Sequence, residues 1–218
     1  MATVPHREPL RPTLIPAADQ TRETHFADGD PQMLGLPIFV VASLALAFSL
    51  VGYVPATAEG VIVPVIFAGT GLGLVIATVW AAARGQGMAA AVFGLFAGFW
   101  MSYAILLLGI YHDWFRIPFD AQTKSTALFL ISWSIVMFAL TLATVRLPLA
   151  YTILVALLVA TLVLRTIGVL NADTTLDKAA GYVAFALAAV GIYLFLHSAD
   201  TAMGGRGYLL GPPIVRQT

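Results

Sequence analysis

The sequence predicts an all-α membrane protein with six transmembrane helices. Hydrophobic residues make up 60% of the chain and charged residues 10%, and the mean hydropathy is +0.91. A typical soluble domain has about 25% charged residues. Six long apolar segments follow one another between Met33 and Ser198, and Arg165 is the only Lys, Arg, Asp or Glu inside them. A helix of about 20 such residues matches a hydrocarbon core of about 30 Å.

The six expected helices are separated by short polar connections. They cover Met33–Val54, Val61–Ala83, Met88–Ile110, Thr126–Val145, Pro148–Leu170 and Ala179–Ser198. Asp30 and Pro31 suit the start of the first helix, because the carboxylate can cap it and proline leaves no N–H unpaired. Pro64 and Pro148 also fall in first turns. Pro37 lies deeper, where we expect it to kink or delay the first helix.

Polar tails flank the six-helix domain, which we assign to residues 30–200. Residues 1–29 contain four prolines, mixed charges and no apolar run, so we expect a disordered cytoplasmic tail and not a secretory signal. Residues 201–218 are expected to form a cytoplasmic C-terminal tail. Lys and Arg favour the cytoplasmic side, and cytoplasmic termini place seven of them inside and four outside. The four outside are Arg116, Lys124, Arg165 and Lys178.

Composition also argues against several classes of function. The net charge is zero and there is no cysteine, so we expect no nucleic-acid partner and no cysteine-based metal site. No metal-ligand cluster or hydrolase constellation stands out, so we expect no metal, no cofactor and no enzyme. Arg165 is expected to snorkel to the outer interface, and His197 to face lipid headgroups. The acidic residues expected in loops are Glu59, Asp113, Asp120, Asp173 and Asp177.

Two pairs of glycines are spaced four residues apart within expected helices. They are Gly69 with Gly73 in the second and Gly94 with Gly98 in the third. In lipid, this spacing lets helix backbones approach closely, so we expect helix packing there. The alternative is that these small residues leave space for a permeant molecule.

The start of the first helix carries a resemblance to a known family. The residues from Asp30 to Phe39 resemble the motif Asn-Pro-Ala-Pro-Leu-Gly-Leu-x-x-Phe of the acetate uptake transporter family, the succinate–acetate permeases. The stretch from Phe93 to Ser102 is similar to that family's aromatic–glycine stretch ending in Phe-Trp. The similarity covers about Asp30 to Pro213. The resulting entrance motif consists of Asp30, Pro31, Leu34, Gly35 and Leu36.

The resemblance implies a homo-hexamer in the plasma membrane, with a pathway through each six-helix subunit. It implies proton-linked uptake of small monocarboxylates such as acetate, with succinate in some members. By position, Phe39, Phe96 and Leu158 would form an apolar constriction. At about 1.5 Å per residue they lie about 9, 12 and 15 Å from the expected starts of their helices, near one depth. A tyrosine is common in this family at the position of Phe96, so the constriction of this chain would lack that hydroxyl.

Two other functions are compatible with six apolar spans. One is a channel for small neutral solutes such as urea or amides, and the other is a membrane subunit that transports nothing. We expect no charged residue inside the membrane that could carry a proton. If the substrate is a carboxylate, the proton therefore travels on the substrate, because an ionised carboxylate is very costly to move through an apolar ring.

Overall fold

The computed structural model describes residues 29–215, and in this range the regular structure is helical, without strands. Six helical spans are long and apolar enough to cross a bilayer, and each overlaps one expected segment. The predicted six-helix class is therefore confirmed. The predicted N-terminal tail falls, except for Gly29, outside the described residues. The spans are Gln32–Leu50, Thr57–Ala83, Gly87–Tyr111, Phe119–Thr144, Leu149–Asn171 and Thr174–Ala202.

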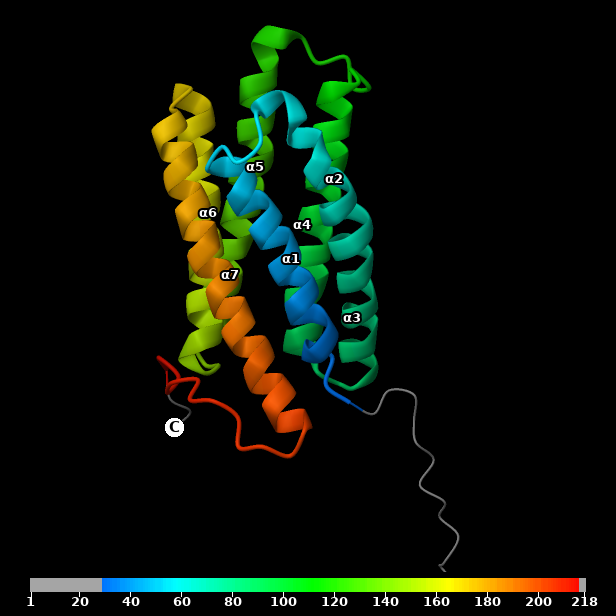
Figure 1. Ribbon diagram of the computed structural model, residues 1–218, viewed down its shortest axis with the longest axis vertical. Helices are drawn as coiled ribbons and strands as arrows, with labels where there is room; N and C mark the ends of the chain where they lie inside the picture. The colour runs from blue at the N-terminus through cyan, green and yellow to red at the C-terminus, as the bar shows by residue number, and fades with distance from the viewer. Residues whose placement is uncertain (1–28, 216–218) are drawn as a thin grey trace, which may run out of the picture.

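The helices stand side by side in a ring that closes when the last one packs against the first (Figure 1). The order around the ring is α1, α3, α4, α5, α6 and α7. Both ends of the described chain lie at one end of the bundle, which we call the terminal end; the other is the opposite end. The long helices are α1 (Gln32–Leu50), α4 (Gly87–Tyr111), α5 (Phe119–Thr144), α6 (Leu149–Asn171) and α7 (Thr174–Ala202).

The second span changes its helical pitch along its length. It consists of η1 (Ala56–Val61), α2 (Ile62–Pro64), the π-helical η2 (Val65–Gly71) and α3 (Leu72–Ala83). The π-helix begins directly after Pro64, where a missing N–H disturbs the regular hydrogen-bond ladder. The hydroxyl of Thr70 in this stretch donates to the Ile38 carbonyl of α1 at 3.1 Å, which ties the second span to the first.

The first helix begins where its polar start predicts. The backbone N–H of Gln32 donates to Asp30 Oδ1 at 3.0 Å, and the helix is already formed at Gln32. Pro37 lies inside α1 without delaying it, so that part of the expectation is wrong. Proline lacks only its own backbone N–H as a hydrogen-bond donor. The helical turn that precedes Pro37 forms without that N–H.

Two helices begin earlier than the apolar pattern indicates. α5 starts at Phe119 and α7 at Thr174, and Asp173 caps α7 by accepting from the N–H groups of Thr175 and Leu176. Asp120 and Asp177 consequently lie in first helical turns and not in loops, which corrects our expectation. Acidic side chains stabilise a helix N-terminus. These two helices therefore begin before the apolar residues that lie in the hydrocarbon core.

Three of the four predicted packing glycines sit against another helix. A methyl group on Gly73 would collide with Ile38, one on Gly94 would lie 3.3 Å from Thr78, and one on Gly98 3.2 Å from Trp133. Gly69 is exposed, and the nearest atom to such a methyl group is the carbonyl of Pro64 in its own span, at 4.0 Å. Gly69 therefore has no neighbouring helix beside it among the described residues, and the packing role predicted for it stays a prediction.

The tail beyond α7 folds back over the terminal end. The Ala150 N–H at the start of α6 donates to the Leu210 carbonyl at 2.9 Å. The Tyr208 N–H donates to Nδ1 of His197 at 2.8 Å. His197 thus holds the C-terminal segment, whereas we had expected it to face headgroups, and α7 itself continues to Ala202.

Candidate functional site

A cavity of about 450 Å³ opens at the terminal end between α1, α4 and α6. Its walls are mostly apolar, and its polar groups gather where the helices begin and end. There the Tyr151 hydroxyl donates to Gln32 Oε1 at 2.6 Å, and Gln86 and Thr144 also line the space. We call this cavity the terminal vestibule; it has a polar rim above an apolar interior.

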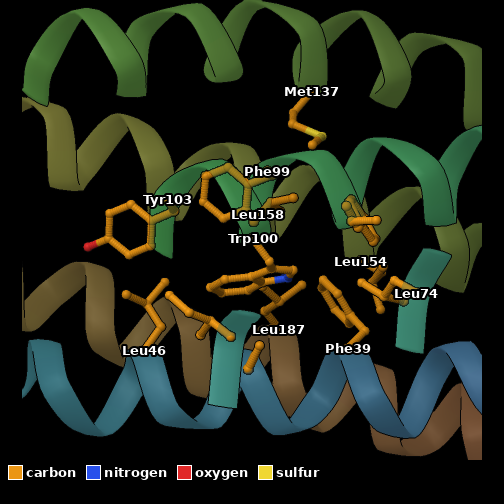
Figure 2. Packing of buried hydrophobic residues seen from close by; sticks show 14 of the residues in the cluster. Phe39, Leu46, Leu74, Phe99, Trp100, Tyr103, Met137, Leu154, Leu158 and Leu187 are labelled. Carbon is orange, nitrogen blue, oxygen red and sulfur yellow. The ribbon is translucent and has the colours of Figure 1, made fainter. Parts of the chain in front are cut away.

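The interior of the terminal vestibule ends on two stacked aromatic rings. Phe39 of α1 and Phe96 of α4 have ring centroids 4.6 Å apart and an interplanar angle of 19°. Both line the vestibule, and they are 1% and 2% exposed. Leu158 of α6 is 1% exposed in the same core, one turn beyond Leu154, which also lines the vestibule (Figure 2). All three residues of the predicted constriction thus face the interior of the bundle.

A second cavity, of about 300 Å³, lies at the opposite end. It is bounded by the end of α1, the segment that follows it, α6 and the start of α7, and it shares no lining residue with the terminal vestibule. Its walls carry two acids, two bases and hydroxyl groups, so its chemistry differs from the apolar interior of the first. We call it the opposite vestibule. Its polar lining residues are Ser49, Glu59, Arg165, Thr174, Asp177 and Lys178.

Buried apolar side chains separate the two vestibules. We call this region the neck and define it by Phe39, Phe96, Trp100 and Leu158, which all belong to the buried apolar core. Figure 2 shows three of them, Phe39, Trp100 and Leu158. Each of the four is at most 2% exposed. In this conformation the neck is filled with side chains, so a solute crosses only when some of them move aside.

Arg165 and Asp177 form an ion pair in the opposite vestibule that corrects our expectation for both. Their Nη1 and Oδ2 atoms are 2.6 Å apart, and the side chains are 21% and 23% exposed. Arg165 therefore pairs within the protein, whereas we had expected it to snorkel to the interface. The early start of α7 brings Asp177 beside α6. A charge within an apolar segment normally has a partner, and this rule could have pointed to an acid near the next helix.

Gly168 makes space for this ion pair. A methyl group there would collide with Oδ1 of Asp177. We expect Gly168→Ala to displace the carboxylate and lower the midpoint of thermal unfolding in detergent by about 5 °C, since overpacking of this kind costs about 1–3 kcal/mol. Gly60→Ala is the matched control, because a methyl group on Gly60 meets nothing within 4 Å. Equal midpoints for the two variants would contradict the prediction.

The entrance motif lies at the rim of the terminal vestibule, and its members differ in position. Leu36 is buried and lines the vestibule. A side chain on Gly35 would overlap the ring of Phe93, so this glycine lets α1 approach α4 closely. Leu34 is partly buried against the core, while Asp30 and Pro31 form the helix start. Leu36 is thus the motif residue that contacts the cavity.

Comparison with known proteins gives a family match over most of the chain. A model of the GPR1/FUN34/yaaH family matches residues 11–214. The acetate transporter protein patA of Aspergillus clavatus is 26% identical over 178 residues, 78% of this chain and 72% of patA. The meiotically up-regulated gene 86 protein of Schizosaccharomyces pombe is 35% identical over 130 residues. That match includes 56% of this chain and 41% of the yeast protein, so the chain spans less than half of that relative.

A solved structure supports the fold. The bacterial acetate channel SatP superposes with a TM-score of 0.72, over 81% of this chain and 96% of the SatP chain. Sequence identity across the superposition is 18%. The arrangement of six helices in a ring is therefore shared with a solved membrane channel.

Proposed function

Because the chain belongs to the GPR1/FUN34/yaaH family, we propose that it carries small monocarboxylic acids such as acetate across the membrane, between its two vestibules and through the neck. The sequence resemblance stated above is thus confirmed at the level of the family. The observation that carries the proposal is the pair of cavities at the two ends of the bundle, with buried apolar side chains between them. The names of patA and SatP support acetate as the substrate.

The neck favours the neutral form of the acid. A bare carboxylate is very costly to place among phenylalanine and leucine side chains, by much more than an uncharged amide or hydroxyl, which costs about 2–7 kcal/mol. Protonating an acid with a pKa of about 4.5 at pH 7 costs about 3.4 kcal/mol. We therefore propose that the acid crosses the neck with its proton attached.

The charged groups lie outside the neck, where they suit the ionised acid. Arg165 and Lys178 line the opposite vestibule together with Asp177 and Glu59. We had expected no ionisable groups in the interior, and this ion pair corrects that expectation. It lies at the end of the pathway and not at its narrowest part. Arg165 offers several N–H donors to a carboxylate, so the opposite vestibule suits an acid that has yet to gain its proton or has just lost it.

The pH dependence of uptake tests this proposal. In proteoliposomes at constant total acetate, we expect the initial rate to rise about tenfold for each unit by which external pH falls between pH 8 and 6, as the protonated fraction rises. Protein-free liposomes give the passive rate of acetic acid, which is subtracted. A protein-dependent rate that does not change with pH contradicts transport of the neutral acid. Urea flux without acetate flux would instead identify a channel for neutral solutes.

We also propose that the chain forms a homo-hexamer in the plasma membrane with both termini in the cytoplasm. Large apolar side chains on the outer faces of α3 and α5 support burial of these faces in lipid or against neighbouring subunits. Examples are Ile76, Val79, Leu128, Ile135 and Phe138, which are all exposed in the single chain. The count of Lys and Arg in the sequence, seven in segments on the side of the termini and four on the other side, supports the orientation.

A further inference from the structure

One polar group in the neck has no partner. Trp100 is 0% exposed, and its indole Nε1 forms no hydrogen bond with any of the described residues. Buried donors in proteins nearly always have an acceptor, because water must be removed from them on folding. An unpaired N–H at this position therefore requires an explanation of its own.

The surroundings of Trp100 explain why no protein group accepts from it. It lies on α4, four residues beyond Phe96 and therefore on the same helix face, one turn closer to the opposite end. Figure 2 shows its ring between Leu158 and Leu187, with the nitrogen on the side of Phe39. Hydrocarbon side chains provide no acceptor, and the nitrogen lies on the side of Phe39, which also lines the terminal vestibule.

We propose that the Nε1–H of Trp100 donates a hydrogen bond to the carbonyl oxygen of the undissociated carboxylic acid as it passes the neck. This inference rests on the proposed function and assigns a binding group to the apolar barrier. A tryptophan N–H is a donor only and carries no charge. Its hydrogen bond can replace part of the hydrogen bonds with water that a neutral acid loses in the neck. It does not attract an anion as strongly as a lysine or arginine would.

Tyr103 continues this face of α4 towards the opposite vestibule. It lies three residues beyond Trp100, is 4% exposed, and its hydroxyl points away from Trp100 in Figure 2. Phe96, Trp100 and Tyr103 thus form an aromatic stripe that leads from the terminal vestibule to the opposite end. Along this stripe, Trp100 provides the donor nearest to the stacked rings.

The test removes the N–H while an aromatic ring is kept. We expect Trp100→Phe to lower the initial rate of acetate uptake at subsaturating concentration about fivefold, or about 1 kcal/mol, as for the loss of one neutral hydrogen bond. Trp133→Phe is the matched control, because Trp133 is half-buried on α5, packs edge-on against Phe99 and lies outside the neck. Full-length protein in proteoliposomes is used, and elution from a sizing column verifies folding.

A binding measurement makes the test independent of transport and of the folding of Trp100→Phe. In a variant with Trp80, Trp114 and Trp133 replaced by phenylalanine, Trp100 is the only indole. We expect acetate to change its emission at pH 5 and much less at pH 7, where the anion predominates. Equal uptake by Trp100→Phe and Trp133→Phe, or emission that acetate leaves unchanged at pH 5, would overturn the inference. Absence of acetate uptake by the unaltered chain would overturn the proposed function instead.

Discussion

Replacing Asp177 with leucine is expected to lower the free energy of unfolding by about 3 kcal/mol, because Arg165 then keeps its charge in a mostly buried site without a counter-ion. The two side chains are in contact at 2.6 Å and are each about one-fifth exposed. Chemical denaturation of the purified chain in detergent measures the change. Asp120→Leu is the control, since Asp120 lies in the first turn of α5 and is exposed, and we expect it to cost less than about 1 kcal/mol.

The double variant Arg165→Met/Asp177→Leu separates the cost of an unpaired charge from the value of the pair. We expect it to unfold within about 1 kcal/mol of the original chain, because two apolar side chains of similar size have no charge to desolvate. If the double variant is as much less stable than the original chain as Asp177→Leu is, the ion pair itself stabilises the contact between α6 and α7, and the expectation is wrong.

The second large effect is expected at the stacked rings. Phe96→Ala removes one of two rings whose centroids lie 4.6 Å apart, so we expect a loss of about 3–5 kcal/mol in the free energy of unfolding. We also expect the neck to widen, so that the flux ratio of butyrate to acetate in proteoliposomes rises on the order of tenfold, as is typical when a steric barrier to a longer chain is removed.

Phe99→Ala is the control for this experiment, because it removes a ring of the same size from the same helix. Phe99 is 1% exposed and packs towards α5, against Phe129 and Trp133. We expect a similar loss of stability but an unchanged flux ratio. Equal flux ratios for Phe96→Ala and Phe99→Ala would contradict the assignment of Phe96 to the neck, whereas the loss of stability alone would not support it.

The six spans were predictable because hydrocarbon imposes a strong constraint on composition. A helix that lies in lipid needs about 20 apolar residues, whatever its neighbours are, so each span is visible in the sequence without reference to the others. The ends were less predictable. α5 and α7 extend beyond the apolar pattern because their first turns carry Asp120 and Asp177, which suit a helix N-terminus in a polar environment.

The candidate site was predictable only through the family resemblance. Phe39, Phe96 and Leu158 are three apolar residues among many, and composition does not distinguish a residue that faces the interior from one that faces lipid. The ion pair between Arg165 and Asp177 was missed because the helix boundary of α7 was placed too late. Gly69 lies on an exposed face of the chain, which its spacing could not reveal, because spacing within a helix does not show which face meets a neighbour.

The sequence by itself determined that this protein has six membrane-spanning helices, and it identified the family through the motif at Asp30–Phe39. Both are local properties, one of composition and the other of residue order. The tertiary structure alone decided that Phe39 stacks on Phe96, that Asp177 neutralises Arg165, and that the N–H of Trp100 finds no partner among residues 29–215. These depend on which faces of different helices meet, and in an apolar span, whose faces are chemically alike, packing geometry decides that.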